Sequence, residues 1–164
     1  FLDFADSNIR EIIVGAGSNI RRIITQVPID YTGNQLPNAP RFKVSASAEY
    51  TFNLGRFGSL RPRYDLVFTD SFSFDPSKDG RGAPDNNGRF FLPKFAVGQD
   101  AYILHNARLS YLTAEDKIEL SFWVRNFTDK VYKSLAFDAS STAGLTANLV
   151  GDPRTYGMTL NLTF

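Results

Sequence analysis

The sequence predicts an all-β protein: a segment of an antiparallel transmembrane β-barrel, with about six long strands that belong to a larger up-and-down barrel. Three observations lead to this prediction. Apolar and polar residues alternate with a period of two, which is the pattern of a strand with one apolar and one polar face. The alternating stretches run for about ten to fifteen residues, whereas strands of soluble domains average ~5–6. The links between them are alternately long and short, as in outer-membrane barrels.

Composition agrees with strands and excludes several classes of protein. Of 164 residues, 43% are hydrophobic and 14% are aromatic, and aromatic rings favour strands. Eighteen basic residues stand against seventeen acidic ones, so the net charge of +1 gives no strongly basic surface for nucleic acid. The chain has no cysteine, which excludes a disulfide framework and a thiolate zinc site. The sequence indicates no catalytic residue, no metal site and no cofactor.

The predicted strands differ in clarity along the chain. Residues 1–14 are the weakest candidate, because their alternation is poor. Four further strands are predicted at residues 41–54, 60–74, 101–112 and 117–126. The alternation is strictest in the stretch 152–164, where one face carries Tyr156, Met158, Leu160, Leu162 and Phe164.

The links predict which end of the barrel is which. Short links are predicted at residues 55–59 and 113–116. Long links are predicted at residues 15–39, 75–99 and 133–151. If Phe164 lies in the periplasm, every short link falls on the periplasmic side and every long link falls outside the cell, which is the arrangement of outer-membrane barrels.

The polar faces carry the charges of the strands. Seven basic and three acidic residues lie there in the four strands before the last, a sum of +4. A one-residue slip in register would place such charges against lipid. Each basic residue near mid-membrane would then destabilise the protein by about 2–4 kcal/mol. The polar face is therefore predicted to face the lumen, with the charges Arg41, Lys43, Glu49, Arg61, Arg63, Asp65, Arg108 and Arg125, together with Lys117 and Glu119.

Three motifs resemble the carboxyl-terminal part of TonB-dependent outer-membrane receptors. The ending GDPRTYGMTLNLTF, residues 151–164, is similar to the last strand of these receptors. The stretch RNFTDKVY, residues 125–132, is similar to their penultimate strand. The stretch DYTGNQLPNAPRFKVSASAEYTF, residues 30–52, is similar to a loop and strand found earlier in the same barrel. The motifs occur in the order of the family and together cover over a quarter of the chain.

The resemblance implies a barrel of about twenty-two strands around a plug domain, with an N-terminal box that binds TonB. Residues 1–164 show neither plug nor box and are expected to form the C-terminal portion of the barrel. The implied function is that of a receptor and active transporter that takes up a scarce nutrient, such as a metal chelate, with energy passed through TonB. The implied location is the outer membrane of a Gram-negative bacterium. The implied partners are outer-membrane lipid, the rest of the barrel and plug, TonB and the barrel-assembly machinery, but not nucleic acid.

Other interpretations remain open at this level. A complete eight-stranded barrel with a channel or structural role is feasible if residues 1–39 form three or more strands. A soluble lectin-like sandwich would also show alternation. An outer-membrane enzyme would require the single histidine, His105. Its neighbour Asn106 falls on the opposite face of a strand and is poorly placed to orient it, so an interfacial strand residue is the favoured interpretation.

Candidate sites follow from these expectations. Ligand contacts are expected in the outer loops, where charge and stacking surface come from Arg81, Arg89, Phe90 and Phe91. The lumen charges either attract an anionic ligand such as a metal chelate or, as the favoured interpretation, form ion pairs within the wall or with a plug. Tyr156, Met158, Leu160, Leu162 and Phe164 resemble the terminal signature by which barrel proteins are recognised for membrane insertion. Residues 75–86 begin with the spacing of a calcium loop, but they end on asparagine without flanking helices, so a polar loop tip is expected.

Overall fold

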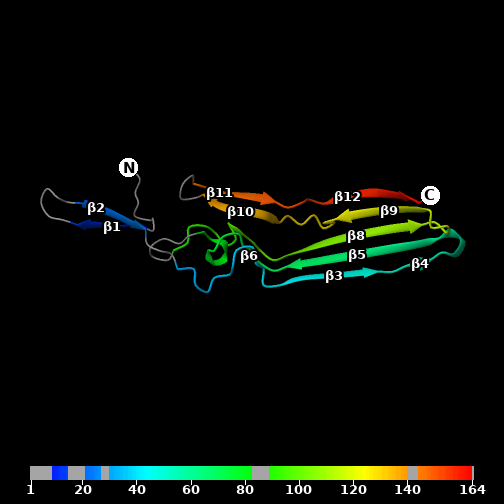
Figure 1. Cartoon of the computed structure of the whole chain (residues 1–164), viewed down its shortest axis with the longest axis horizontal. Coiled ribbons are helices and arrows are strands. Elements are labelled where there is room, and N and C mark those ends of the chain that lie inside the picture. The colour runs from blue at the N-terminus through cyan, green and yellow to red at the C-terminus, as the bar shows by residue number, and fades with distance from the viewer. Residues whose placement is uncertain (1–8, 15–20, 27–29, 83–88, 140–143, 164) are drawn as a thin grey trace.

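The main feature of the chain is one open antiparallel sheet of long strands (Figure 1). A computed structural model describes residues 9–14, 21–26, 30–82, 89–139 and 144–163. The order of strands across the sheet is β12-β9-β8-β5-β3, which confirms the predicted all-β, antiparallel fold class. These strands are β3 (Lys43–Glu49), β5 (Ser59–Thr69), β8 (Tyr102–Leu112), β9 (Ile118–Arg125) and β12 (Thr155–Leu162). None of the helical segments in the described part of the chain has the length and hydrophobicity to span a bilayer.

The pairing register separates two faces across the whole sheet. One lateral row is apolar and runs through Leu60, Tyr111, Leu120 and Leu160. The adjacent row is polar and runs through Arg61, Ser110, Ser121 and Thr159. Successive side chains of a strand point to opposite faces of the sheet. Since apolar residues are in register with apolar ones across all four strands, the apolar rows lie on one face. The predicted separation of apolar and polar residues onto opposite faces is therefore confirmed, and the lumen beside the polar face stays a prediction.

The apolar face is exposed rather than packed into a core. Among the described residues, the buried apolar side chains are Val97 and Ala136, and both lie outside the main sheet. On β12, Tyr156 is 80% exposed and Met158 is 63% exposed. A soluble sandwich would cover such a face with a second sheet, and none of the described strands does so.

The strand lengths suit a tilted crossing of a membrane. β5 and β8 have 11 residues each. At ~3.3 Å per residue such a strand is about 36 Å long, and at a tilt of ~45° it spans about 26 Å, close to the ~25 Å apolar band of outer-membrane barrels.

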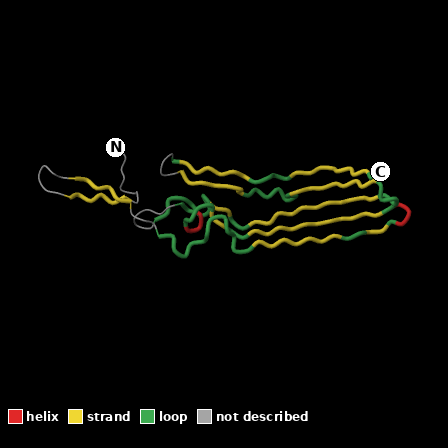
Figure 2. Tube along the Cα trace, in the orientation of Figure 1, coloured by secondary structure: helices red, strands yellow, loops and turns green. Residues whose placement is uncertain are grey.

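The short links and the carboxyl end lie at the same end of the sheet, as predicted (Figure 2). One short link contains β4 (Phe52–Asn53) and a 3-10 helix, η3 (Gly55–Phe57). The predicted strand 41–54 is interrupted at Tyr50, whose N–H donates to the Pro62 carbonyl at 3.2 Å. Proline has no N–H to donate in return, so the ladder between β3 and β5 breaks at this point.

The opposite end of the sheet differs from the prediction in three places. The predicted strand 60–74 ends at Thr69, and β6 (Phe72–Ser73) pairs instead with β7 (Gly98–Gln99). The predicted link 133–151 contains a hairpin of β10 (Lys133–Ala139) and β11 (Leu145–Val150). The predicted link 15–39 contains β2 (Arg21–Gln26), which pairs with β1 (Ile9–Val14). The residues before β1, predicted as part of a strand, lie outside the described residues.

Candidate functional site

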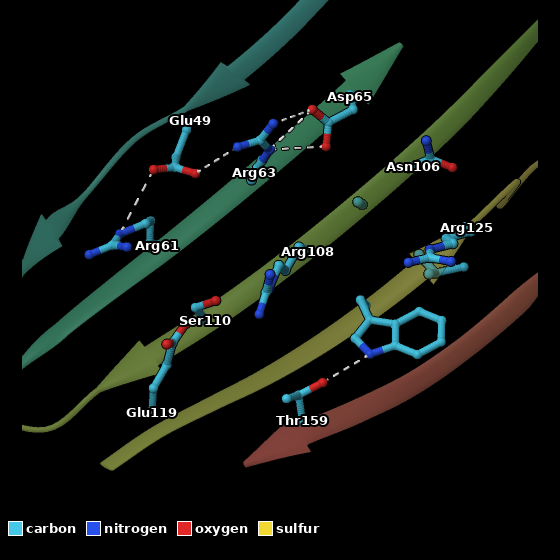
Figure 3. A pocket seen from close by; sticks show the side chains of 13 residues that line it. Glu49, Arg61, Arg63, Asp65, Asn106, Arg108, Ser110, Glu119, Arg125 and Thr159 are labelled. Atoms are coloured by element: carbon cyan, nitrogen blue, oxygen red, sulfur yellow. Dashed lines mark hydrogen bonds and ion pairs between the residues drawn. The ribbon is translucent and has the colours of Figure 1, made fainter. Parts of the chain in front are cut away.

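A groove of about 740 Å³, here called the polar groove, crosses the polar face of the main sheet (Figure 3). It receives side chains from β3, β5, β8, β9 and β12. Seven of the predicted lumen charges line it: Glu49, Arg61, Arg63, Asp65, Arg108, Glu119 and Arg125. The groove therefore collects, from five strands, residues that are far apart in the sequence.

The other predicted lumen charges lie elsewhere. Arg41 is exposed and precedes β3. Lys43 lines a smaller cavity of about 240 Å³ at the loop end of the sheet. Lys117 lies in the turn before β9, where its Nζ is 2.8 Å from the Glu115 carboxylate.

One side of the polar groove is an ion-pair network between β3 and β5. The Arg63 guanidinium donates to the Asp65 carboxylate at 2.9 Å from Nη2 and at 3.1 Å from Nε. Glu49 lies 3.7 Å from Arg63 Nη1 and 3.9 Å from Arg61 Nε. These side chains are about half exposed, so each pair contributes on the order of 1 kcal/mol or less.

The middle of the groove is a hydrogen-bonded cluster centred on Ser121, whose side chain is fully buried. The hydroxyls of Ser121 and Ser110 lie 2.7 Å apart. Arg108 Nη2 donates to the Ser121 hydroxyl at 3.2 Å, and that hydroxyl donates to Glu119 Oε1 at 3.2 Å. The second Glu119 oxygen accepts a bond of 3.3 Å from Asn161 Nδ2, which carries the cluster onto β12.

The far side of the groove is built around Trp123, which was not predicted as a site residue. Its indole Nε1 donates to the Thr159 hydroxyl at 3.3 Å, and the Arg125 guanidinium lies 5.3 Å from its ring centroid. Gly157 is the register partner of Trp123, and a Cβ there would lie 2.5 Å from Trp123 Cζ2. The glycine therefore provides the space in which the ring lies flat on the wall.

The charges of the groove are close to balance. Four arginines and three carboxylates line it, which gives +1. The difference from the wider sum of +4 comes from three basic residues outside the groove: Arg41, Lys43 and Lys117. Arg61 and Arg63 are ion-paired, whereas Arg108 and Arg125 form no ion pair with any described residue. Arg108 is instead hydrogen-bonded to Ser121, and Arg125 lies over the Trp123 ring.

The RNFTDKVY motif forms a tight turn that joins β9 to β10. Asn126 is 5% exposed and has a φ of 48°. Its Nδ2 donates to the carbonyls of Lys130 at 3.0 Å and Asp152 at 3.1 Å, and its Oδ1 accepts from Lys130 N at 2.9 Å. Asp129 Oδ1 accepts from Arg154 N at 3.0 Å. Two motifs of the sequence therefore bind each other directly at the end of β9 and the start of β12.

The predicted loop contacts form cation–π pairs. Arg81 lies 5.8 Å from the Phe90 ring centroid, and Arg89 lies 5.6 Å from that of Phe91. This places charge and ring surface together in the loop after β6. Whether these residues bind a ligand stays a prediction.

The same loop is held to the hairpin β10–β11 by one lysine. Lys133 Nζ donates to the carbonyls of Phe95 at 2.6 Å and Ala96 at 3.0 Å, and Lys133 N donates to Gln99 Oε1 at 2.6 Å. Burial lowers the pKa of the Lys133 ammonium below its ordinary value. The stack of Tyr102 on Tyr132, with centroids 4.8 Å apart, lies beside this contact.

The calcium-like stretch has a local explanation. Asp75 Oδ1 accepts from the Ser77 N–H at 3.2 Å and from the Ser77 hydroxyl at 2.6 Å, which is the geometry of a turn closed by an aspartate side chain. In the part of the chain that the structure describes, no three His, Cys, Asp or Glu residues are grouped to hold a metal ion.

The remaining predicted residues lie on the apolar face. Tyr156, Met158, Leu160 and Leu162 are all at least half exposed there, and Phe164 lies outside the described residues. His105 also lies on this face, in register with Leu66. Its Nδ1 is 2.7 Å from the Tyr64 hydroxyl, and its ring is 5.4 Å from the Phe127 ring.

Comparison with known proteins agrees with this architecture. The family model described as "TonB dependent receptor-like, beta-barrel" matches residues 14–127. No curated protein matches the chain. Among solved structures, the ferric yersiniabactin uptake receptor FyuA from Yersinia pestis is similar, with a TM-score of 0.64 and 21% sequence identity over 88% of this chain. The match covers 20% of that receptor, so the chain spans about a fifth of its length.

Proposed function

Because this chain belongs to the TonB-dependent receptor-like β-barrel family, we propose that it forms the carboxyl-terminal wall of an outer-membrane receptor that imports a scarce nutrient. The nutrient class that we propose is a metal chelate, which agrees with the ferric chelate receptor that shares its fold. The energy for import would come from the inner membrane through TonB. The proposed location is the outer membrane of a Gram-negative bacterium.

The observation that carries this proposal is the division of one open sheet into two exposed faces. The apolar rows match a lipid environment, because a large exposed apolar surface in water would be covered by a partner or would aggregate. The polar rows carry an ion-pair network and two arginines without an ionic partner among the described residues. Such a wall fits a water-filled lumen that holds a further protein segment, as the plug of a receptor does.

The open edges of the sheet support a larger barrel over a small complete one. β3 and β12 lie at the two edges of the main sheet. Each unpaired backbone group that faces hydrocarbon costs several kcal/mol, so strands from elsewhere would have to pair with both edges in a membrane. We propose that the rest of the receptor supplies them. The alternative of a closed small barrel has no support in this strand order.

The surroundings of His105 support a non-enzymatic function. Its Nδ1 is engaged by the phenol of Tyr64, and its ring contacts Phe127. These are the contacts of an amphipathic residue in an apolar wall. We propose instead that ligand contact comes from the loop pairs Arg81–Phe90 and Arg89–Phe91.

The two faces can be tested with spin labels at neighbouring positions of β3. Ala46 and Ser47 lie on opposite faces, and no cysteine of this chain competes for labelling. In the full gene product in lipid vesicles, a label on Ala46→Cys should collide with dissolved oxygen, and a label on Ser47→Cys should collide with a water-soluble nickel chelate. The opposite pattern would contradict the assignment of faces.

Import is tested by comparing a strain from which the gene is deleted with the same strain carrying the gene on a plasmid. Radiolabelled ferric chelates of the catecholate, hydroxamate and phenolate classes are the probes. We expect accumulation of at least one probe only when the gene is present, and its loss when the proton gradient is collapsed or TonB is absent. Accumulation that does not depend on the gradient would indicate a passive channel.

A further inference from the structure

A second groove, here called the outer groove, lies on the apolar face where the sheet opens. The pairing of β8 with β9 stops at Ala107, because the chain leaves β9 at Arg125 and turns through residues 126–131. Between this turn and the outer half of β8 lies a groove of about 610 Å³. It combines an apolar floor with polar groups at its rim, and neither the ion-pair network nor the polar groove uses it.

The floor of the outer groove is apolar and continuous with the exposed face of the sheet. Phe68 and Ile103 are register partners and are the outermost apolar-face residues of β5 and β8. Val131 closes the groove from the turn and is 75% exposed. An acyl chain lying along the sheet could continue into this floor without leaving apolar surface.

The rim of the outer groove is polar and carries one lysine and one aspartate. Lys130 is exposed and forms no ion pair with any described residue, while both its backbone groups are held by Asn126. Thr128 lies on the same rim. Asp129 is the one acidic lining residue, and its Oδ1 is occupied by the Arg154 N–H. The Arg154 guanidinium is bound to the same turn, with Nη1 3.5 Å from the Phe127 carbonyl.

We propose that the outer groove binds a membrane lipid with an anionic head group, whose phosphate charge is not balanced by a cationic group in the same lipid. The acyl chains would lie on Phe68, Ile103 and Val131, and the phosphate would accept hydrogen bonds from the Lys130 ammonium and the Thr128 hydroxyl. Position supports a lipid as the occupant, because the groove lies at the end of the apolar band, where lipid head groups meet water. The proposal rests on the membrane embedding proposed above.

Native mass spectrometry of the full gene product in detergent tests the proposal. The probes are phosphatidylglycerol, whose head group is anionic, and phosphatidylcholine, whose head group has no net charge. We expect preferential retention of phosphatidylglycerol, and Lys130→Gln should weaken it roughly tenfold, since a hydrogen bond from a charged donor is lost. Lys130→Arg should retain binding because it keeps the cation.

Lys117→Gln is the matched control, since Lys117 is an exposed lysine at the opposite end of β9. It should leave lipid binding unchanged. Equal loss in Lys117→Gln, unchanged binding in Lys130→Gln, or equal retention of the two lipids would overturn the proposal. Displacement of phosphatidylglycerol by millimolar inorganic phosphate would also overturn it, because the site would then be one for free phosphate. If the spin-label pattern on β3 stays as expected while lipid discrimination is absent, the lipid site alone is wrong.

Discussion

Asp129 accepts a hydrogen bond from the backbone N–H of Arg154, although the whole hairpin β10–β11 separates the two residues in the chain. Asn126 makes a parallel contact with the carbonyl of Asp152, at 3.1 Å. Together the two bonds form a clamp between the end of β9 and the start of β12. The clamp explains why an asparagine and an aspartate are needed in this turn: one supplies both donor and acceptor atoms, and the other accepts from a backbone N–H at the start of a strand.

Asn126→Ala should destabilise the barrel by about 2–4 kcal/mol, since it removes the partners of three backbone groups at a buried site and places alanine at positive φ. Unfolding of the full gene product in detergent, followed by the shift of its folded band on a gel during heating, measures the change. Asn161→Ala is the control, because that exposed residue donates a single bond to Glu119, and it should cost less than about 1 kcal/mol. Equal effects of the two substitutions would mean that the clamp is not a main source of stability.

Gly157→Ala should cost about 1–3 kcal/mol, because the new methyl group would meet the ring of Trp123 and displace it from Thr159. The cost should nearly vanish in a Trp123→Ala background, where the space is free. A double-mutant cycle on the free energy of unfolding measures this coupling. An unchanged cost in the double mutant would show that the glycine serves some purpose other than making room for the indole.

Gly58→Ala should be more damaging than Gly55→Ala in the short link between β4 and β5. Both glycines have positive φ. Alanine costs about 1 kcal/mol of backbone strain at Gly55, and more at Gly58, whose φ of 92° and ψ of -141° lie in a region that essentially only glycine adopts. At Gly55 nothing lies near the new Cβ, whereas at Gly58 it would collide with the backbone carbonyl of Leu112. Chemical unfolding of the two variants should therefore rank Gly58→Ala as clearly less stable, and similar midpoints would contradict the close packing of the two turns.

Lys133→Met should loosen the loop after β6, since two carbonyls lose the ammonium that bonds to them. Hydrogen exchange at residues 93–99 should become faster, whereas Lys94→Met should leave it unchanged because its ammonium lies over the Phe95 ring instead. Unchanged exchange in Lys133→Met would show that other contacts hold the loop.

Lys133 should make the free energy of unfolding depend on pH in the alkaline range. Burial lowers its pKa in the folded state, so the unfolded chain binds more protons between the lowered and the ordinary value. Stability should therefore rise with pH across that alkaline window. The measurement is the free energy of unfolding of the unmutated protein minus that of Lys133→Met at each pH. A difference that falls with rising pH would contradict a desolvated ammonium.

The two faces of the sheet could be predicted because strand parity depends on sequence alone. Leu160 and Thr159 are assigned to opposite faces by alternation, and the register with β9 keeps them there. The hairpin β10–β11 was missed, since its strands have only 7 and 6 residues and each offers few positions at which alternation can stand out. Pro62 was a readable signal for the break between β3 and β4, because proline cannot complete a ladder on the side of its nitrogen.

The sequence predicts most of the charged residues of the polar groove, but it does not predict which of them pair with one another. Which arginine pairs with which carboxylate depends on neighbours across strands, as Arg63 with Glu49 shows. Trp123 was not predicted as a site residue, because nothing in the sequence of its own strand explains an aromatic side chain on the polar face. The explanation is Gly157 on β12, which leaves room for the indole ring. Only the register between β9 and β12 brings the two residues together.

The clamp divides the chain into a constant frame and a variable insert. Since β9 and β12 are already aligned by Asn126 and Asp129, the registration of the wall does not depend on the residues that lie between Lys133 and Val150. That hairpin could therefore change its length and composition while the pairing of β9 with β12 is kept.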